Sequence, residues 1–198
     1  MSLWSTYGFA VEPRPLDVAE LFGRRAPLVV EIGFGTGTAT AHMAAAEPQR
    51  DLIAVDVHRP GIGNLLRHID DRALHNVRVA DGDGFMLLRD MLAPHSVEQV
   101  RLYFPDPWPK RAHHKRRLVN ASFAQIVASR LAPGGLLHIA TDWADYAEHV
   151  LTVLRAEPAL QLEHDGASPR PSWRPVTKFE QRGLDAGHTI TDILARKL

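Results

Sequence analysis

The chain has 198 residues with 23 basic and 23 acidic side chains, so its formal net charge at neutral pH is zero. This length suffices for one domain, residues 1–198, and the hydrophobic fraction of 45% is ordinary for a globular protein. The lack of cysteine excludes disulfides, cysteine-based zinc sites and a catalytic thiol. Because the sequence shows no signal peptide and no apolar run long enough to span a membrane, we expect a cytoplasmic protein that does not engage membranes.

Strand-like and helix-like patterns alternate along most of the chain. Short apolar runs predict buried strands at 28–32, 52–56, 76–80, 99–104 and 136–141. Apolar residues recur at helical spacing of three and four at 62–69, 123–127 and 143–154. This alternation predicts an α/β fold with a doubly wound, mostly parallel sheet.

The two ends of the chain depart from that pattern. Residues 159–164 and 188–197 alternate more openly, which is typical of antiparallel strands at a sheet edge. Residues 1–27 precede the first predicted strand and are expected to form a lead-in. Residues 165–183 are rich in Pro, Gly and Arg and predict a long loop on the substrate side.

Every unusual motif of the sequence follows a predicted strand. The motifs are, in order, EIGFGTG, Asp56, ADGD, PDPW with a basic strip, and Thr141-Asp142-Trp143. In doubly wound sheets, ligands bind beyond the carboxyl ends of the strands, which meet at one edge. The sequence therefore predicts one site there.

The first motif is a glycine loop between a strand and a helix, with Gly33, Gly35 and Gly37. Dinucleotide-binding loops need G-x-G-x-x-G/A, and neither register here places a glycine or alanine at the third position. With Glu31 before the first glycine, the loop resembles the S-adenosylmethionine loop of class I methyltransferases. In those proteins the acid that ends the next strand, here Asp56, holds the ribose hydroxyls. A glycine-rich turn without a ligand is the alternative.

Two further acids have two interpretations each. Glu31 suits the ammonium group of the methionine part of the cofactor, or it is a buried helix cap. Asp83 contacts the cofactor, or it is the N-cap of a helix predicted over 85–92, and both roles are compatible. Asp81 competes with Asp83 for the ligand role.

The segment FPDPWPKRAHHKRR, residues 104–117, combines rigidity with charge. Two prolines fix the backbone on both sides of Asp106, and Trp108 offers a flat ring beside it. This arrangement resembles the base-handling motif of nucleic-acid amino-methyltransferases, in which the aromatic ring stacks on the base and the polar residue binds its edge. The alternative is a rigid turn with Trp108 half-buried.

A basic strip follows directly. Residues 110–117 hold five Lys or Arg and two His without an acid, so the remainder of the chain carries a net charge of −5. The strip predicts contacts with nucleic-acid phosphates. A solvated helix N-terminus is a poorer interpretation, because positive charge opposes the helix dipole there. The two adjacent histidines have no nearby acid, so we expect no metal site.

Five motifs in order, EIGFGTG, FPDPWPK, HHKRRL, ATDW and RPVTKFEQRG, resemble the bacterial tRNA (guanine-N7-)-methyltransferase family (TrmB). The resemblance runs from about residue 3 to the C-terminus. It implies a Rossmann-like class I fold and transfer of a methyl group from S-adenosylmethionine to N7 of a guanine in the tRNA variable loop, which forms 7-methylguanosine.

The resemblance also implies roles for individual residues. Contacts with the cofactor are implied for Glu31, Gly33, Gly35, Gly37, Asp56 and Asp83. Asp106 matches the family's catalytic position, which can also lie against the cofactor. Substrate binding is implied for Lys110, Asp142, Thr177, Lys178, Phe179 and Glu180. Contact with RNA is implied for Trp108, Arg111, His113, His114, Lys115, Arg116 and Arg117.

Two of the substrate positions have structural alternatives. Thr177 and Glu180 fit a capping box, although Gly183 and Gly187 follow, so we expect a helix of about one turn. Asp142 fits the N-cap of the helix that is predicted to start at Trp143.

The sequence departs from the family at Ala112, where members usually carry arginine, and at its short N-terminal segment, which indicates a short form or a trimmed chain. Oligomeric state stays open between a monomer and a homodimer. Three other functions remain as alternatives: an adenine amino-methyltransferase, a nicotinamide oxidoreductase and a non-catalytic tRNA-binding module.

Overall fold

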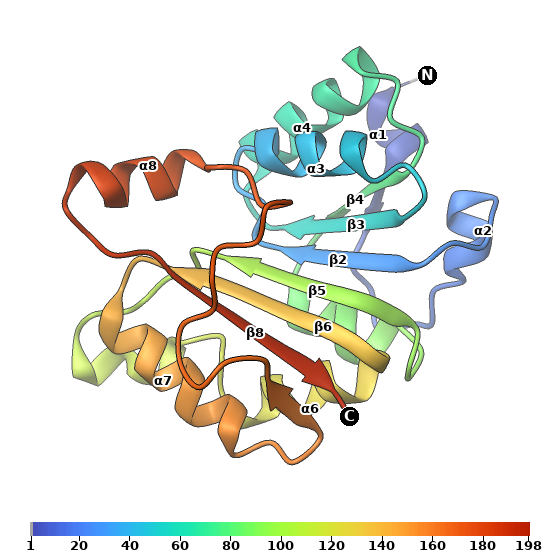
Figure 1. The fold of residues 1–198 in the computed structure, drawn as a ribbon. Helices are drawn as coiled ribbons and strands as arrows, with labels where there is room; N and C mark the ends of the chain where they lie inside the picture. The colour runs from blue at the N-terminus through green and yellow to red at the C-terminus, as the bar shows by residue number, and fades with distance from the viewer. Residues whose placement is uncertain (1) are drawn as a thin grey trace.

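An eight-stranded sheet runs through the molecule in the order β1-β4-β3-β2-β5-β6-β8-β7 (Figure 1). The computed structural model describes residues 2–198, apart from the side chain of Lys178. The strands are β1 (Gly8–Ala10), β2 (Leu28–Ile32), β3 (Asp51–Asp56), β4 (Val77–Asp81), β5 (Val97–Tyr103), β6 (Leu131–Thr141), β7 (Leu160–Leu162) and β8 (Thr191–Lys197). Neighbouring strands from β1 to β6 are parallel, whereas β8 pairs antiparallel with both β6 and β7. The predicted fold class is confirmed.

Helices cover both faces of the sheet. They are α1 (Leu3–Tyr7), α2 (Val18–Phe22), α3 (Thr38–Ala46), α4 (Arg59–Asp71), α5 (Gly84–Met86), α6 (Ala121–Arg130), α7 (Ala144–Arg155) and α8 (Lys178–Asp185), with a π-helix η1 (Leu87–Met91) and a 3₁₀-helix η2 (Arg111–Arg116). None of the helices described is long and apolar enough to cross a membrane.

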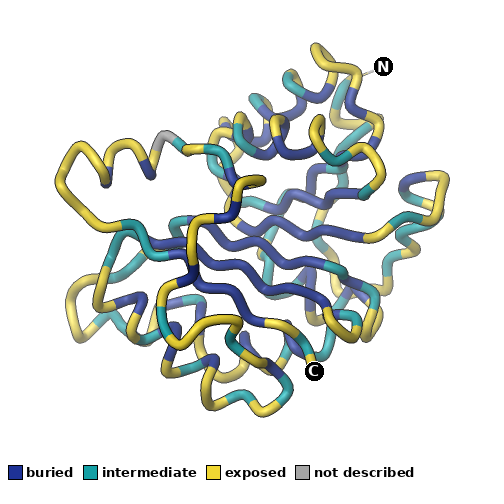
Figure 2. Tube along the Cα trace, in the orientation of Figure 1, coloured by how far each residue is buried: buried dark blue, intermediate teal, exposed yellow. Residues whose placement is uncertain are grey.

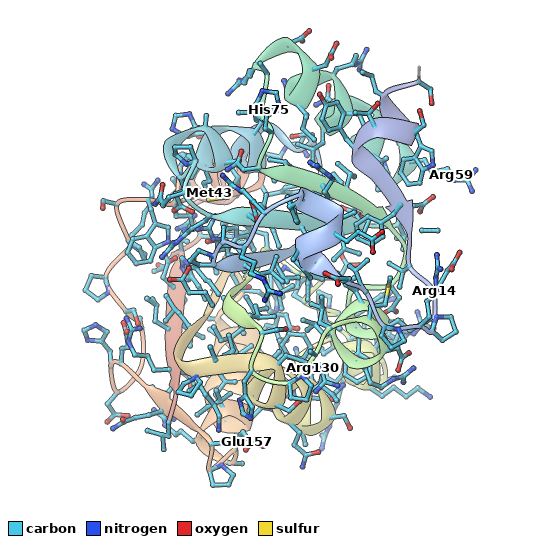
Figure 3. All side chains as sticks on the ribbon, turned by 90° about the vertical axis from the view of Figure 1, so that its right-hand side faces the viewer. Arg14, Met43, Arg59, His75, Arg130 and Glu157 are labelled. Atoms are coloured by element: carbon cyan, nitrogen blue, oxygen red, sulfur yellow. The ribbon has the colours of Figure 1, made fainter. Side chains whose placement is uncertain are left out.

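Alternation along β2 assigns each face of the sheet to one layer of helices. Val29 belongs to a core cluster with residues of α3 and α4, whereas Val30 and Ile32 belong to the cluster of η1, α6 and α7. Successive side chains of a strand point to opposite faces, so β2 is buried on both sides. Figure 2 shows the central strands as buried and much of α8 as exposed. Charged side chains such as Arg14 and Arg59 project from the outside of the fold (Figure 3).

The structure adds elements that the sequence analysis missed. The lead-in 1–27 contains α1, β1 and α2, and β1 extends the sheet by pairing with β4. These elements have three to five residues, too few to establish a periodic pattern. The predicted loop 165–183 is wrong at its end, because α8 begins at Lys178. Strand β6 begins five residues earlier than predicted, at Leu131.

The order of the strands places the predicted site. From β2 the chain moves outward through β3 and β4, then returns to β5 on the other side of β2. The crevice between the carboxyl ends of β2 and β5 is the position where doubly wound sheets bind ligands. The glycine loop follows β2, and the PDPW motif follows β5.

Candidate active site

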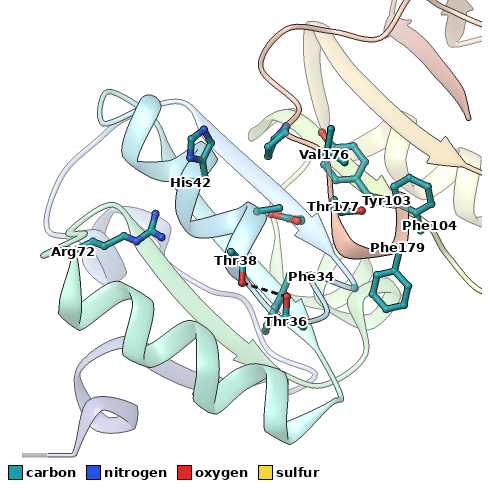
Figure 4. Close-up of a pocket in the computed structure, with 14 residues that line it drawn as sticks. Phe34, Thr36, Thr38, His42, Arg72, Tyr103, Phe104, Val176, Thr177 and Phe179 are labelled. Carbon is teal, nitrogen blue, oxygen red and sulfur yellow. Dashed lines mark hydrogen bonds between the residues drawn. The ribbon is translucent and has the colours of Figure 1, made fainter. Parts of the chain in front are cut away.

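A cavity of about 270 Å³ opens at this switch point (Figure 4). One wall is the glycine loop with the start of α3, a second is Tyr103 and Phe104 at the end of β5, and a third is the segment from Pro175 to Phe179. Its volume approaches the lower end of the roughly 300–1,000 Å³ typical of small-molecule sites. Of the predicted site residues, the cavity is lined by Glu31, Gly33, Thr177 and Phe179.

The glycine loop has a conformation that only glycine adopts without strain. Gly33, Gly35 and Gly37 have φ angles of 73°, 60° and 73°. A Cβ atom on Gly37 would lie 2.6 Å from the Cβ atom of Leu65, so this glycine lets α3 begin close to α4. A Cβ atom on Gly35 would lie 3.3 Å from Cε2 of Phe179, which shows how closely the third wall approaches the loop.

Asp56 holds the glycine loop in place. Its Oδ2 accepts a hydrogen bond of 2.9 Å from the backbone N–H of Gly35, and its Oδ1 accepts one of 2.9 Å from that of His58. The carboxylate is half-buried and stands at the rim predicted for it. It does not line the cavity in this structure.

Glu31 is a buried carboxylate with one unsatisfied oxygen. Its residue is 2% exposed, and Oε2 has no partner among the described residues. Burial raises the pKa of Glu31 to about 7, against the opposing effect of Arg101 on the paired position of β5. The helix-cap alternative is wrong, because α3 is capped by Gly37 without a side-chain bond. A buried carboxyl group facing a cavity fits a cationic ligand group.

Asp83 and Asp142 lie outside the cavity, with different partners. Asp83 is exposed and accepts a hydrogen bond of 2.9 Å from the backbone of Met86, so the predicted cap is confirmed. The cap predicted for Asp142 is wrong, because Trp143 caps α7 without a side-chain bond. Instead Oδ2 of Asp142 lies 3.1 Å from Nδ1 of His188, beyond the end of α8.

The loop after β5 is strained on both sides of Asp106. Phe104 and Trp108 have φ angles of 53° and 45°, a left-handed conformation that is uncommon for aromatic residues. The backbone N–H of Phe104 is fixed by a 2.7 Å hydrogen bond to Ala140. Asp106 is exposed and does not line the cavity, although Phe104 of the same loop does. Strain of this kind clusters at functional sites.

The ring of Trp108 already has neighbours. The guanidinium carbon of Arg116 lies 4.9 Å from the ring centre, and the ring of His113 meets it edge-on at 5.9 Å. Trp108 is half-buried, as the structural alternative predicted. Stacking on a base therefore needs the opposite ring face or displacement of Arg116.

The basic strip forms the short helix η2, and most of it is accessible. Lys110, Arg111, Lys115 and Arg116 are exposed, while His113 and His114 are half-buried. Within the described part of the chain, no group of three or more His, Cys, Asp or Glu is placed to hold a metal ion.

Arg117 requires a correction to the predicted RNA contacts. Its residue is 3% exposed. Nε donates a 2.9 Å hydrogen bond to the carbonyl of Pro107, and the guanidinium pairs with Asp145 and lies 5.0 Å from the ring centre of Tyr146. Because Arg117 is buried and its Nε and Nη2 bind Pro107 and Asp145, it anchors the PDPW loop to α7 and is not exposed to a phosphate.

Glu180 requires a similar correction. The predicted capping box with Thr177 is confirmed, but α8 has eight residues instead of about one turn. Glu180 is 2% exposed, and both of its oxygens accept hydrogen bonds from Arg174, at 2.5 and 3.2 Å. It is therefore not accessible to a substrate. Phe179 is 52% exposed at the cavity, and the side chain of Lys178 lies outside the described residues.

Sequence reasoning missed the buried polar partners behind these walls. Arg101 is fully buried and pairs with Glu47 at 2.8 Å. Tyr103 and His138 form a hydrogen bond of 3.0 Å in the sheet. A polar residue in an otherwise apolar strand was the only available signal, because the partners are far apart in sequence.

Comparison with known proteins agrees with this geometry. A family model described as "Putative methyltransferase" matches residues 25–193. The chain is 52% identical over 198 residues to a tRNA (guanine-N(7)-)-methyltransferase of Streptomyces avermitilis, covering 99% of this chain and 68% of the relative. It belongs to the tRNA (guanine-N7-)-methyltransferase family. A second relative of that name, from Streptomyces coelicolor, is 51% identical and covers 99% of this chain and 73% of its own length.

The fold extends to more distant proteins. A SAM dependent methyltransferase from Aquifex aeolicus superposes with a TM-score of 0.60 at 12% identity, covering 91% of this chain and 88% of that one. At this identity the likeness shows the fold alone. It supports the class I, Rossmann-like architecture that the strand order describes.

Proposed function

We propose that this chain transfers a methyl group from S-adenosylmethionine to N7 of a guanine in the variable loop of tRNA. Family membership supports N7-guanine methylation of tRNA, since the matching relatives are named tRNA (guanine-N(7)-)-methyltransferase. The observation of this structure that carries the proposal is Glu31, a buried carboxylate beside the glycine loop that lines the cavity and whose Oε2 has no hydrogen-bond partner among the described residues. The reaction would take place in the cytoplasm, where tRNA is modified.

The residues of the cavity fit S-adenosylmethionine. Glu31 would bind its ammonium group, because a cation would give the unsatisfied Oε2 a partner and would favour the ionised carboxylate. Gly33 and Gly35 let the ligand approach the backbone, and Asp56 stands at the rim where ribose hydroxyls would lie. Bound there, the cofactor supplies an electrophilic methyl group on a sulfonium centre.

Guanine N7 is an acceptor with a free lone pair and carries no proton, so no base has to deprotonate it before attack. We therefore assign Asp106 an orienting and electrostatic role. Its carboxylate would accept hydrogen bonds from the guanine edge and stabilise the positive charge that the purine gains. Lys110 and Asp142 would place the nucleotide, so that N7 meets the methyl group in line.

The basic strip would hold the tRNA backbone. Lys110, Arg111, Lys115 and Arg116 are exposed on one short segment beside the PDPW loop. Contacts of this kind bring affinity that falls steeply with salt and carry no sequence information. Selection of guanine would then rest with Asp106 and with the aromatic residues around it.

Nucleoside analysis after methyl transfer tests the proposal. The chain is incubated with labelled S-adenosylmethionine and unmodified tRNA, and the tRNA is digested to nucleosides. Label in 7-methylguanosine is the expected result. Label in N6-methyladenosine would indicate the amino-methyltransferase instead. Binding of tRNA and cofactor without any transfer would indicate a binding module, and calorimetric binding of a nicotinamide cofactor alone would indicate an oxidoreductase.

A further inference from the structure

A buried ion network fixes both ends of the third cavity wall, the segment 175–179. Arg174 precedes this segment and is 1% exposed, and Glu180 follows it and is 2% exposed. The two side chains bind each other through hydrogen bonds of 2.5 and 3.2 Å. Glu180 also closes the capping box, because Thr177 accepts a 3.0 Å bond from its backbone N–H. The Arg174–Glu180 ion pair therefore closes the segment between these two residues into a loop.

Arg174 also attaches this ion pair to the sheet. Its Nε and Nη2 donate two parallel hydrogen bonds of 2.8 Å to the two oxygens of Asp192 on β8. This pair of parallel hydrogen bonds requires the planar guanidinium, whose donors have a fixed geometry that an ammonium group lacks. The guanidinium carbon also lies 5.8 Å from the ring centres of Tyr103 and Phe104, which form the second cavity wall.

Asp192 continues the network toward the cavity. Its Oδ1 accepts a hydrogen bond of 2.7 Å from Nε2 of His138, whose Nδ1 lies 3.0 Å from the hydroxyl of Tyr103. Burial lowers the pKa of His138, so the ring is neutral, donates through Nε2 and accepts the tyrosine proton at Nδ1. Although burial acts in the opposite direction, His138 and Arg174 hold the pKa of Asp192 below its usual range.

The charges of the network balance only when the segment is in place. Asp192 and Glu180 are two buried carboxylates, and Arg174 is the buried cation between them, with the half-exposed Arg170 at 3.7 Å from Glu180. If the segment moved away together with Arg174 and Glu180, Asp192 would lose its charged partner inside the sheet. Removing one member of a buried ion pair is strongly destabilising, so the network favours one position of the segment.

We infer that Arg174 and Glu180 are positioning residues that hold segment 175–179 as a wall of the cofactor cavity, and that Glu180 acts there instead of touching tRNA. Figure 4 shows Val176, Thr177 and Phe179 of this segment beside Tyr103 and Phe104. The inference rests on the proposed function only for the identity of the ligand in the cavity.

Cofactor binding and tRNA binding, measured separately, test this inference. The variants are Arg174→Lys, which keeps the charge but loses the paired hydrogen bonds to Asp192, and Glu180→Gln, which keeps the shape but loses the charge. Arg155→Lys is the matched control, since Arg155 pairs with Asp165 at the surface, away from the cavity. The dissociation constant for S-adenosylhomocysteine is measured by calorimetry, that for tRNA by filter binding without cofactor, and folding by thermal melting. Hydrogen exchange of residues 175–183 reports the order of the segment directly.

We expect both variants to weaken cofactor binding about tenfold, as interactions in one network do, and to speed amide exchange in the segment. The double variant should bind the cofactor about as well as the weaker-binding single variant, because both changes break the same ion pair. tRNA affinity should stay within about twofold, and the control should match the wild type. Glu180→Gln, the milder change, keeps the test valid if Arg174→Lys does not fold.

Two results would overturn the inference. One is unchanged cofactor affinity in folded Arg174→Lys and Glu180→Gln. The other is a loss of tRNA affinity in Glu180→Gln with cofactor affinity intact, since that would make Glu180 a substrate contact. Wild-type methyl transfer is measured on the same preparation. If it gives no 7-methylguanosine while cofactor affinity responds to the variants as expected, the proposed function fails and the positioning role stands.

Discussion

Gly61 of helix α4 lies directly against the carbonyl oxygen of Gly35 in the glycine loop. A Cβ atom on Gly61 would stand 1.9 Å from that oxygen, a distance no real contact allows. The first turn of α4 therefore supports the loop from below. Gly63, two residues further along the same helix, is exposed, and a Cβ atom added there would meet nothing within 4 Å.

This pair of glycines gives the first prediction. Gly61→Ala should displace the glycine loop, lower the free energy of unfolding by about 1–3 kcal/mol and weaken cofactor binding. Gly63→Ala is the control, and it should stabilise the helix by up to about 1 kcal/mol with cofactor affinity unchanged. Denaturant melts and calorimetry measure both effects. Wild-type affinity in Gly61→Ala would show that the loop does not depend on this contact.

The raised pKa of Glu31 predicts a pH dependence of binding. Its value of about 7 in the fold exceeds the ordinary 4.5, so the free protein holds an extra proton between these values. This group therefore stabilises the fold most at low pH, and its contribution is lost as pH rises toward 7. Binding of the cofactor through its ammonium group requires the ionised form of Glu31. Its dissociation constant should fall about tenfold per pH unit from pH 5 up to about 7, then level off.

Calorimetry with S-adenosylhomocysteine across pH 5 to 7.5 measures this profile. Glu31→Gln removes the titrating group, so it should bind weakly with no dependence on pH in that range. If the wild type gives a flat profile, Glu31 is not the residue that receives the ammonium group.

Removal of Arg117 should affect stability, whereas removal of its neighbour Arg116 should affect tRNA binding. Arg117→Ala takes away a buried anchor of the PDPW loop and should lower the free energy of unfolding by about 1–3 kcal/mol. Arg116→Ala changes an exposed side chain and should leave stability within about 0.5 kcal/mol. It should instead weaken tRNA binding and reduce the salt slope of log K by about one. Thermal melts and salt-dependent filter binding separate the two, and a tRNA defect confined to Arg117→Ala at full stability would contradict this division.

The glycine loop and the PDPW motif show what the sequence could predict. Both depend on local sequence, because glycines, prolines and an apolar run determine the backbone conformation within a few residues. Parallel strands then bring their carboxyl ends to one edge of the sheet. Strand β2 accordingly has its predicted bounds. The placement of Arg117 could not be predicted in this way, because a basic strip looks the same whether one member is solvated or buried against Tyr146.

Long-range polar pairs explain the other misses. The contacts of Arg174 with Glu180 and Asp192 depend on how α8 lies on the sheet, and the sequence indicated only a capping box. Helix α8 is longer than predicted because tertiary contacts of Glu180 stabilise a helix that contains Gly183. The elements α1, β1 and α2 are too short for their patterns to stand out from the lead-in.

Asp106 provides a test of the chemistry. Asp106→Asn should reduce kcat/KM by about 100-fold, which is typical for removal of one group that stabilises charge in a transition state. The dissociation constant for the cofactor should stay within about twofold, because Asp106 does not line the cavity. Single-turnover methyl transfer and calorimetry measure the two quantities. Full turnover by the variant would exclude both the orienting and the electrostatic role.

The central claim is methyl transfer to guanine N7, and replacing that atom tests it most directly. Two tRNA transcripts are prepared that differ only in carrying guanosine or 7-deazaguanosine in the variable loop, and each is incubated with the chain and labelled S-adenosylmethionine. We predict that the first transcript accepts label as 7-methylguanosine and that the second accepts none. Equal incorporation into both transcripts would contradict the claim, because the methyl group would then have gone to another atom.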